Sequence, residues 1–257
     1  MLSRRTLAPL LCCVLITCPN AIVRLAGAAE TPSAGTPVQQ PLPGSPTSLT
    51  RLAKDYDIWF DPKRKLVVVD GRICLREGLL EMFACPRGTK EHESIVAVNC
   101  TSRFVHAALL AVGAKEGKPM QYEPEYKPAT GPIVDVYVLW KDEQGNNHKA
   151  RAQEWIKELK TGKAMTHPWV FGGSGFWTDP ETKKEYYYAD GGELICVSNF
   201  SAAMLDLPIP SPKDNDDLQF TAFTERIPPL GTKIRLVLIP QPEGKAKEAP
   251  PAPPKQP

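Results

Sequence analysis

The chain between residues 49 and 240 contains many short apolar stretches with the two-residue alternation of β-strands. The alternation is clearest at residues 133–140, where Val134, Val136, Val138 and Trp140 share one face. Residues 232–240 alternate in the same way and predict the closing strand. Shorter apolar runs bounded by turn residues predict further strands, at residues 57–60, 65–69, 72–75, 79–84, 95–98 and 193–197.

Turn residues between these runs predict that neighbouring strands are antiparallel. Asp61-Pro62-Lys63-Arg64 separates the first two runs, and Asp70-Gly71 is a typical hairpin dipeptide before the third. Residues 72–75 and 79–84 flank Arg76-Glu77-Gly78 and predict another hairpin. We therefore expect the first part of the domain to be an antiparallel meander.

Three stretches have helical spacing instead. The longest runs from Thr101, a suitable N-terminal cap, to Gly113, which stands where a C-terminal glycine is expected. Residues 155–159 and 201–205 predict one or two short helices. The fold class predicted from these patterns is α+β, a mainly antiparallel β-sheet with one long helix and one or two short helices packed on it.

Composition divides the chain into four parts. Residues 1–29 have the arginine pair Arg4-Arg5, an apolar run and small residues near Ala28, which predict a signal peptide and hence an exported protein. Residues 30–48 are rich in Pro, Ser and Thr and predict a flexible linker, whereas residues 49–240 are long enough for one domain with a hydrophobic core. Residues 241–257 are rich in Pro, Ala and Lys and predict a disordered or polyproline-like tail.

Charge and hydropathy narrow the range of partners. The chain carries a net charge of +2, but removal of Arg4, Arg5 and Arg24 with the signal peptide leaves about −1, which argues against a nucleic-acid partner. The apolar run at residues 7–17 is shorter than the roughly 20 residues of a spanning helix, so we expect no transmembrane segment in the mature chain. Thr17 stands where a lipoprotein signal has Gly or Ala, which argues against a lipid anchor at Cys18.

Four cysteines remain beyond the signal region: Cys74, Cys85, Cys100 and Cys196. In an exported protein they allow two disulfides in three connectivities. The predicted hairpin at residues 72–84 would place Cys74 and Cys85 about 17 Å apart along the strand, beyond disulfide reach. The other pairings stay open, and buried free thiols are the interpretation that we favour.

The greatest concentration of reactive side chains lies between a predicted strand and the next, at residues 85–94. The candidate site residues there are Cys85, Arg87, Lys90, His92, Glu93 and Ser94. In an extended entry to the second strand, Lys90, His92 and Ser94 would share one face. Arg87, Lys90 and the backbone around Gly88 could hold an anion, while the plainer interpretation is that His92 and Glu93 only bond the neighbouring turn.

Three chemistries are open to this stretch. Zinc or iron could be bound by Cys85, His92 and His106, although their spacing matches no compact zinc motif and we predict no cofactor. His92 could activate the Cys85 thiol, giving a metal- or thiol-site protein that uses Cys85, His92 and Glu93. His92 could also act as the base of a hydrolase, although the sequence places no nucleophile or water beside it.

A family resemblance rests on three motifs. Residues 81–113, with Gly-Thr-Lys-Glu-His-Glu-Ser followed by His-Ala-Ala-Leu-Leu, resemble the YdjY-domain family of exported bacterial proteins. Ala-Arg-Ala-Gln-Glu-Trp-Ile at residue 150 and Trp-Val-Phe-Gly-Gly-Ser-Gly-Phe at residue 169 are similar to its second half. The resemblance covers about residues 52–240 and implies a single domain, without implying a reaction. The Cys-x₂-Cys spacing of an iron–sulfur site is absent from the sequence, so we expect none.

A second candidate surface lies in the predicted hairpin of residues 169–189. Its ligand-contacting candidates are Trp169, Phe176, Trp177 and Tyr187, which could stack on a sugar or a peptide or could simply form core and a cross-strand ladder. Because no strong catalytic pattern occurs in the sequence, we favour a non-catalytic exported binding or interaction module over an enzyme. Its partner would be an unidentified protein or glycan.

Overall fold

The computed structural model describes residues 49–214 and 217–242. The predicted signal peptide, the linker, Cys18 and the tail beyond Pro242 lie outside the described residues. Within the described part there is one α-helix, α1 (Ser102–Ala111), and fifteen β-strands.

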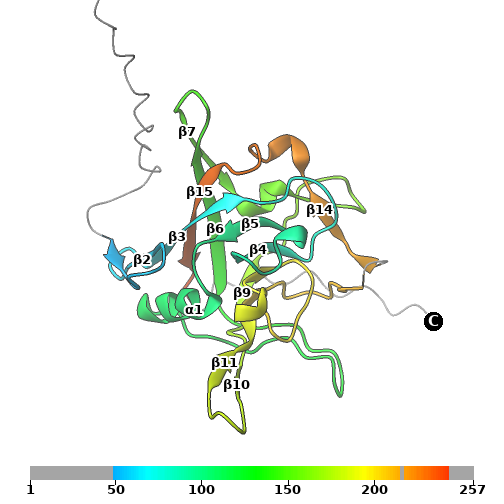
Figure 1. Cartoon of the computed structure of the whole chain (residues 1–257). Coiled ribbons are helices and arrows are strands. Elements are labelled where there is room, and N and C mark those ends of the chain that lie inside the picture. Colours follow the sequence, from blue (N-terminus) through cyan, green and yellow to red (C-terminus); the bar gives the residue numbers. More distant parts are fainter. Residues whose placement is uncertain (1–48, 215–216, 243–257) are drawn as a thin grey trace, which may run out of the picture. The chain divides into compact units, whose positions relative to one another are not determined.

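Eight strands form a closed ring. In ring order they are β3 (Leu66–Ile73), β15 (Lys233–Pro240), β6 (Ile133–Lys141), β9 (Trp169–Phe171), β13 (Leu205–Asp206), β12 (Ile195–Cys196), β4 (Met82–Pro86) and β5 (Ser94–Val98). The ring closes because β5 pairs with β3 through Ile73 and Val96. Most pairs are antiparallel, while β4–β5 and β12–β13 are parallel. The fold is therefore a β-barrel of mixed strand direction (Figure 1).

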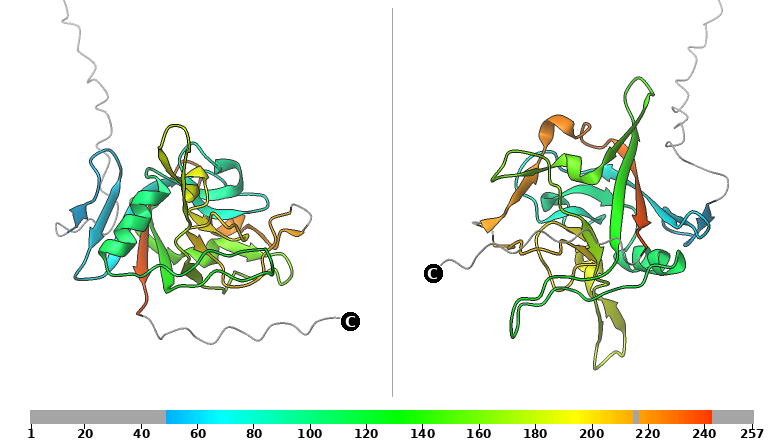
Figure 2. Two further views of the ribbon diagram at one scale, coloured as in Figure 1. Left: turned by 90° about the horizontal axis from the view of Figure 1, so that it is seen from below. Right: turned by 180° about the vertical axis from the view of Figure 1, so that it is seen from behind.

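The remaining strands extend this barrel or stand apart from it. β2 (Ile58–Asp61) pairs with the first half of β3 and with β1 (Thr50–Arg51), and β7 (Asn147–Arg151) pairs with β6. β10 (Phe176–Thr178) and β11 (Glu185–Tyr187) form a separate two-stranded sheet, as do β8 (Ile156–Glu158) and β14 (Phe220–Ala222). The β10–β11 hairpin projects from the barrel in each ribbon view (Figures 1 and 2).

β3 changes partner at Gly71. Residues 66–69 pair with β2, and residues 71–73 pair with β5 on the same side of β3. A Cβ atom on Gly71 would lie 2.6 Å from the backbone oxygen of Ala97. The residue without a side chain thus lets β5 approach closely enough to close the barrel.

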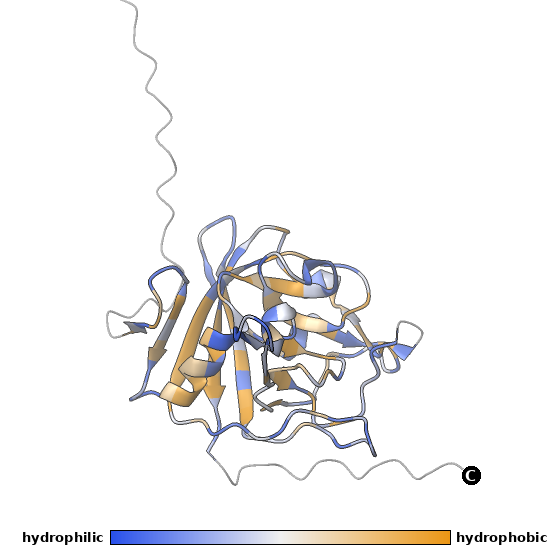
Figure 3. Ribbon diagram, turned by 60° about the horizontal axis from the view of Figure 1, so that its bottom comes forward, coloured by the Kyte–Doolittle hydropathy of each residue, from blue (hydrophilic) through white to orange (hydrophobic). Residues whose placement is uncertain are grey.

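The alternating apolar residues of the longest strands fill the interior, as the sequence predicts. Val134, Val136 and Val138 of β6 are fully buried, and Leu236 of β15 is 1% exposed. Three aromatic side chains form the centre of this core: Phe83 lies 5.6 Å from Trp169 and 6.5 Å from Trp155, measured between ring centroids. The Trp169 indole nitrogen donates to the backbone oxygen of Cys196 over 2.7 Å. Figure 3 shows the apolar residues concentrated along the barrel strands.

The predicted long helix is confirmed, with slightly shorter bounds. It buries Val105, Ala108 and Leu109 and contacts β2 and β3. Gly113, with a φ of 89°, ends it by donating its N–H to the carbonyl of Leu110. This is the left-handed C-terminal position that favours glycine.

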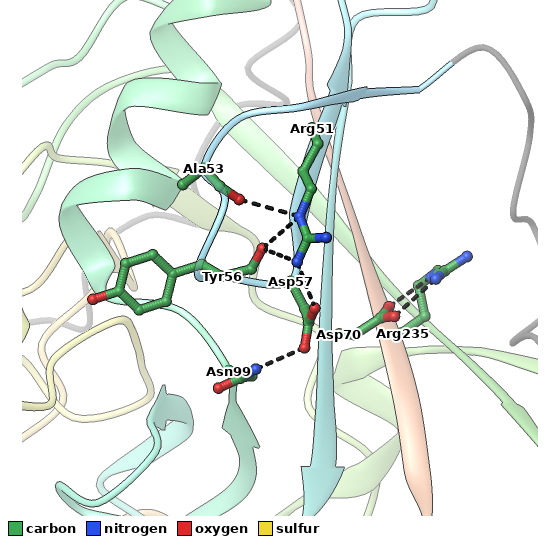
Figure 4. Close-up of polar contacts among 7 residues, drawn as sticks. All are labelled: Arg51, Ala53, Tyr56, Asp57, Asp70, Asn99 and Arg235. Carbon is green, nitrogen blue, oxygen red and sulfur yellow. Dashed lines mark hydrogen bonds and ion pairs between the residues drawn. The ribbon is translucent and has the colours of Figure 1, made fainter. Parts of the chain in front are cut away.

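Polar side chains fasten the first strands to the barrel (Figure 4). The Arg51 guanidinium lies 3.2 Å from Asp57, whose other carboxylate oxygen accepts a hydrogen bond of 2.6 Å from Asn99. Between β3 and β15, Arg235 makes two hydrogen bonds to Asp70, of 2.6 and 2.8 Å.

The α+β prediction, a mainly antiparallel sheet with one long helix and one or two short helices packed on it, was wrong. The structure is mostly β, with a closed eight-stranded barrel and one α-helix in the described residues. Residues 155–159 contain the end of a 3-10 turn (Ala152–Trp155) followed by β8, and residues 201–205 end in β13. Alternating apolar residues occur equally in an open sheet and in a closed one, so the pattern could not reveal closure.

The predicted hairpin of residues 72–75 with 79–84 was also wrong. β3 and β4 are not paired; both pair with β5, β3 antiparallel and β4 parallel to it. Leu79 instead forms an isolated antiparallel bridge with Thr221, which comes much later in the sequence. The chain does reverse its direction between β3 and β4, as the turn residues at 76–78 predict, but β5 lies between the two strands and pairs with both.

Candidate functional site

The stretch of residues 85–94 forms a strand end, a turn and a single 3-10 turn. Thr89 donates its hydroxyl to the carbonyl of Pro86 over 2.6 Å, and Gly88 donates its N–H to the carboxylate of Glu91 over 2.9 Å. Residues 91–93 are a 3-10 turn, after which Ser94 begins β5. The expected extended entry was therefore wrong, and Lys90, His92 and Ser94 do not share a strand face.

Lys90 is the residue around which this stretch is organised. Its ammonium nitrogen lies 3.1 Å from Glu93, 3.5 Å from Glu81 and 3.6 Å from Glu193. The same nitrogen lies 4.9 Å from the centre of the Phe200 ring. The lysine thus joins three segments of the chain through their carboxylates.

Glycine makes room for the lysine stem. Gly192 has a φ of 144°, and a Cβ atom there would lie 2.6 Å from Cγ and Cδ of Lys90. Sequence reasoning singled out Lys90 and Glu93 but missed Glu81 and Glu193. No signal in the sequence could have joined residues 81 and 193, because Val197 and Ser198 reach the backbone of Glu81 only through the fold.

Burial and the neighbouring charges in this cluster shift the pKa values of Glu81 and Lys90. Burial raises the pKa of Glu81, the neighbouring Glu93 raises it further, and Lys90 opposes both effects. Burial lowers the pKa of Lys90, but the carboxylates outweigh burial and raise it overall. The arrangement is a charged joint between strands, and the raised pKa of Glu81 is its chemically unusual feature.

His92 and Cys85 are not brought together as a reactive pair. The His92 side chain is 77% exposed, and its Nε2 lies 3.8 Å from a Glu93 oxygen. Cys85 is fully buried, and burial raises the pKa of its thiol, so little thiolate forms at neutral pH. Arg87 is exposed on the adjoining turn, and Ser94 is buried.

His106, the third metal candidate, lies in a different part of the molecule. Its Nδ1 is 2.8 Å from the Tyr187 hydroxyl and its Nε2 is 2.6 Å from the Glu116 carboxylate, so both ring nitrogens have partners. Within residues 49–214 and 217–242, no three His, Cys, Asp or Glu side chains are grouped so that they could hold a metal ion. Cys85, His92 and His106 therefore do not form a common site in this structure.

The His106 contacts continue into the glycine-rich loop after β9. Tyr187 donates its hydroxyl to the carbonyl of Gly173 over 2.8 Å. Gly173 has a φ of 92°, and a Cβ atom there would lie 2.8 Å from Cβ of Glu116. Burial lowers the pKa of His106, while the Glu116 carboxylate opposes this shift. The chain Glu116–His106–Tyr187–Gly173 ends on a backbone carbonyl, so it holds the loop in place without presenting a reactive group.

The predicted ligand surface is divided between interior and exterior. Trp169 is fully buried and Tyr187 is 2% exposed, whereas Phe176 and Trp177 are 53% and 44% exposed. Two neighbours that the prediction left out are also exposed, Tyr186 at 39% and Tyr188 at 49%. The structure therefore retains two of the four candidates at the surface and adds two tyrosines.

Strand register decides which of these rings share a face. Phe176 pairs with Tyr187 and Trp177 pairs with Tyr186 across β10 and β11. Tyr188 follows β11 as the first residue of a 3-10 turn (Tyr188–Gly191). A Cβ atom on Gly175, two residues before Trp177, would lie 3.2 Å from the Tyr188 ring, which places that ring on the face of Trp177 and Tyr186. We call Trp177, Tyr186 and Tyr188 the aromatic face. The Trp177 and Tyr186 rings are 5.5 Å apart, and the Lys184 ammonium lies 4.9 Å from the Tyr186 ring centre.

All four cysteines beyond the signal region are free in the structure. Cys85, Cys100 and Cys196 are buried and Cys74 is half-buried, in agreement with the free-thiol interpretation.

These features define a β-barrel domain with a projecting aromatic hairpin and a half-buried charged joint. The chain belongs to the YdjY domain family, whose sequence model matches residues 58–239. A search of curated proteins finds no match, and a search of solved structures finds none either. In the described part of the chain, no helix is both long enough and apolar enough to cross a membrane.

Proposed function

We propose that this protein is a non-catalytic binding module that takes its ligand, a protein segment or a glycan, on the aromatic face of the β10–β11 hairpin. The observation that carries the proposal is the exposure of three large rings, Trp177, Tyr186 and Tyr188, on one face of a projecting hairpin. Exposed aromatic patches are typical of interaction sites, because each ring offers a large apolar area and a polar atom at its edge.

The framework of the hairpin supports this role. Asp179 accepts hydrogen bonds from the N–H groups of Glu181 and Thr182 and fixes the connecting turn. Tyr187 anchors the opposite face in the barrel through His106 and Gly173. A hairpin held at both ends presents its rings with little loss of conformational freedom on binding.

The alternatives drawn from the sequence receive less support from the geometry. A thiol site needs a thiolate, but burial raises the pKa of Cys85. A hydrolase with His92 as base needs a nucleophile or a held water beside an imidazole that is 77% exposed. A binding module needs only the surface that the hairpin already presents.

Binding to arrays of oligosaccharides and peptides tests the proposal. The wild-type sequence ended at Pro242, which retains every strand of the barrel, is compared with a triple variant, Trp177→Ala, Tyr186→Ala and Tyr188→Ala, and with the control Leu230→Ala, which removes a 64%-exposed apolar side chain elsewhere. Central aromatic residues of interfaces each contribute about 1–2 kcal/mol or more, so the triple variant should lose at least about tenfold in affinity. The control should bind like wild type, and all three proteins should melt at similar temperatures. Binding that survives the triple substitution, or no binding to either array, would overturn the proposal.

We also propose that the protein is exported and that residues 1–29 are its signal peptide. The support is the sequence pattern of arginines, apolar run and small residues. Expression of the full chain in a bacterium, followed by mass spectrometry of the protein outside the cytoplasm, tests this. A new N-terminus near Ala28 or Ala29 is expected, and an intact N-terminus on protein that stays in the cytoplasm would contradict it.

A further inference from the structure

The sequence beyond Pro242 contains a short proline-rich run. Residues 250–254 are Pro-Pro-Ala-Pro-Pro, four prolines in five positions. Sequences of this kind favour the polyproline II helix, which has three residues per turn and no internal hydrogen bonds. In that conformation residues three apart share a ridge, so Pro250 would share one ridge with Pro253, and Pro251 a second with Pro254. Grooves lined with aromatic rings bind such ridges, because the helix is already formed and costs little entropy to dock.

We propose that the aromatic face is occupied in cis by residues 250–254 of the same chain, so that the ligand class of the module is a proline-rich segment in the polyproline II conformation. The inference rests on the proposed function, because it places the segment on the same three rings.

The rings offer a flat apolar surface to prolines. Tyr186 lies on β11 and Tyr188 directly follows its end, so their backbone positions are at most about 7 Å apart and one short segment can contact both rings. Trp177, 5.5 Å from Tyr186 across the hairpin, extends the platform under the second ridge. The indole N–H and the two phenol hydroxyls can donate to the carbonyls that a polyproline II helix leaves unpaired.

The tail begins close enough to reach this face. Gln241 donates its N–H to Ile133, and Ile133 pairs on its other side with Val170. Gln241 and Val170 are thus separated by two strand spacings, about 10 Å. The five residues from Val170 to Gly175 add at most about 17 Å, which places the hairpin base within about 27 Å of Gln241.

The connecting chain is long enough for that path. Nine steps lead from Gln241 to Pro250, and they span about 28 Å even at the polyproline II rise. Tyr188 stands at the hairpin base, where its N–H donates to Gly175 over 2.9 Å, so it is the first ring of the face that the tail meets.

Attachment in the same chain favours occupancy. A short flexible connection gives an effective concentration on the order of millimolar, which is enough to fill a site of modest affinity. An external proline-rich ligand must then displace the tail, and removal of the tail should expose the face. The tail would act both as a model ligand and as an inhibitor of binding.

The test follows the indole N–H signal of Trp177 by NMR, assigned by its loss in Trp177→Phe. The full chain is compared with the same chain ended at Pro242, which retains every strand of the barrel because β15 ends at Pro240. We expect the Trp177 signal to differ between the two. A synthetic peptide of residues 245–257 added to the shortened chain should move the signal towards its position in the full chain. The same peptide with its four prolines in residues 250–254 changed to alanine should bind at least tenfold more weakly.

Two controls test which face of the hairpin binds the peptide and whether the occupant comes from the same chain or from a second copy. Phe176→Ala removes a 53%-exposed ring from the opposite face of the hairpin and should leave peptide binding unchanged, whereas Tyr186→Ala should weaken it about tenfold. The signal of the full chain should not change on dilution, because the occupant belongs to the same molecule. A signal that does change on dilution would assign the occupant to a second copy and overturn the proposal.

Failure of the inference can be told apart from failure of the proposed function. A Trp177 signal that neither the tail nor the peptide affects would overturn the inference. If glycans or proline-free peptides still bound to the three rings, the proposed binding function would stand without it.

Discussion

Asp70 and Arg235 face one another across the β3–β15 pair, and both hydrogen bonds of the guanidinium to the carboxylate are shorter than 3 Å, at 2.6 and 2.8 Å. Arg235 is 5% exposed and also lies 5.5 Å from the Trp59 ring centre. The pair joins two strands whose residues are 165 positions apart in the sequence.

We expect Asp70→Ala to lower the free energy of unfolding by about 3 kcal/mol, because it leaves a buried guanidinium without its bidentate acceptor. Asp70→Ala combined with Arg235→Met should recover part of this loss. Urea unfolding measures both, with Glu125→Ala as the control because Glu125 and Lys127 form an exposed pair at 3.4 Å. A loss below about 1 kcal/mol for Asp70→Ala would show that the pair behaves like a surface ion pair.

Asp206 should make stability fall as the pH rises. The residue is fully buried and accepts hydrogen bonds from Asn199 and Leu207 on Oδ1, while Oδ2 has no hydrogen-bond partner among the described residues. Burial raises the pKa of Asp206 to about 7. Because the unfolded chain loses this proton near pH 4 and the folded chain only near pH 7, stability declines between these values and stays low above them.

Ionisation of the buried Asp206 carboxyl lowers the free energy of unfolding by an amount on the order of 4 kcal/mol at and above neutral pH, relative to pH 4. Asp206→Asn removes the titrating group, so the difference between wild type and variant should change across this pH window and be constant above it. Thermal unfolding from pH 4 to pH 8 measures the difference. A difference that is the same at pH 4 and pH 7 would contradict the raised pKa.

His106 should make stability fall as the pH decreases, which is the opposite of the effect of Asp206. Burial lowers its pKa below the usual 6.5, and Glu116 limits the shift. The folded protein therefore resists protonation that the unfolded chain accepts, so stability falls as the pH drops below about 6.5. We expect Glu116→Gln to lower the pKa of His106 further, because it removes the charge that favours the imidazolium. NMR titration of the His106 ring measures this, and an unchanged or higher pKa in the variant would contradict the contact of 2.6 Å.

Lys90 should matter far more to stability than His92. Lys90→Met leaves Glu81, Glu93 and Glu193 without the cation between them, and a loss of about 2–3 kcal/mol is expected. His92→Ala removes a 77%-exposed side chain and should change stability by less than about 0.5 kcal/mol. Chemical unfolding measures the stability loss of each variant. Equal losses for Lys90→Met and His92→Ala would mean that the cluster is not organised around the lysine.

The free thiols should resist alkylation in the folded protein. Cys85 and Cys196 are fully buried, and burial raises the pKa of both thiols. Burial also raises the pKa of Cys74 and Cys100 to about 12. Iodoacetamide at pH 8 followed by mass spectrometry should therefore label neither Cys85 nor Cys196 until urea is added. Rapid labelling of either one in the native state would contradict the packing described here.

The sequence was most informative where structure depends on neighbouring residues. The alternation of Val134, Val136 and Val138 predicted a strand with one buried face, and Gly113 predicted the end of the helix, because both signals depend on a few adjacent positions. Family membership could also be inferred from short motifs, and the match over residues 58–239 confirms it.

The features that sequence reasoning missed depend on distant contacts. Barrel closure requires β3 to leave β2 for β5 at Gly71, and no local pattern specifies that exchange. The same holds for Lys90, whose partners Glu81 and Glu193 lie 112 residues apart in the chain. On the hairpin, the aromatic residues were recognised, but strand register was needed to separate the exposed Trp177 from the buried Tyr187.

The position of β15 has a consequence for how the chain folds as it is made. The last strand of the barrel lies between two earlier ones, β3 and β6, and hydrogen-bonds to both along most of its length. Until residues 233–240 have been synthesised, the facing edges of β3 and β6 have no partner and the ring stays open. Such edges are prone to pair with other chains, and pairing across so long a separation is slow. A stop codon anywhere before Lys233 should thus yield an aggregation-prone fragment, because the barrel is completed in a single late step.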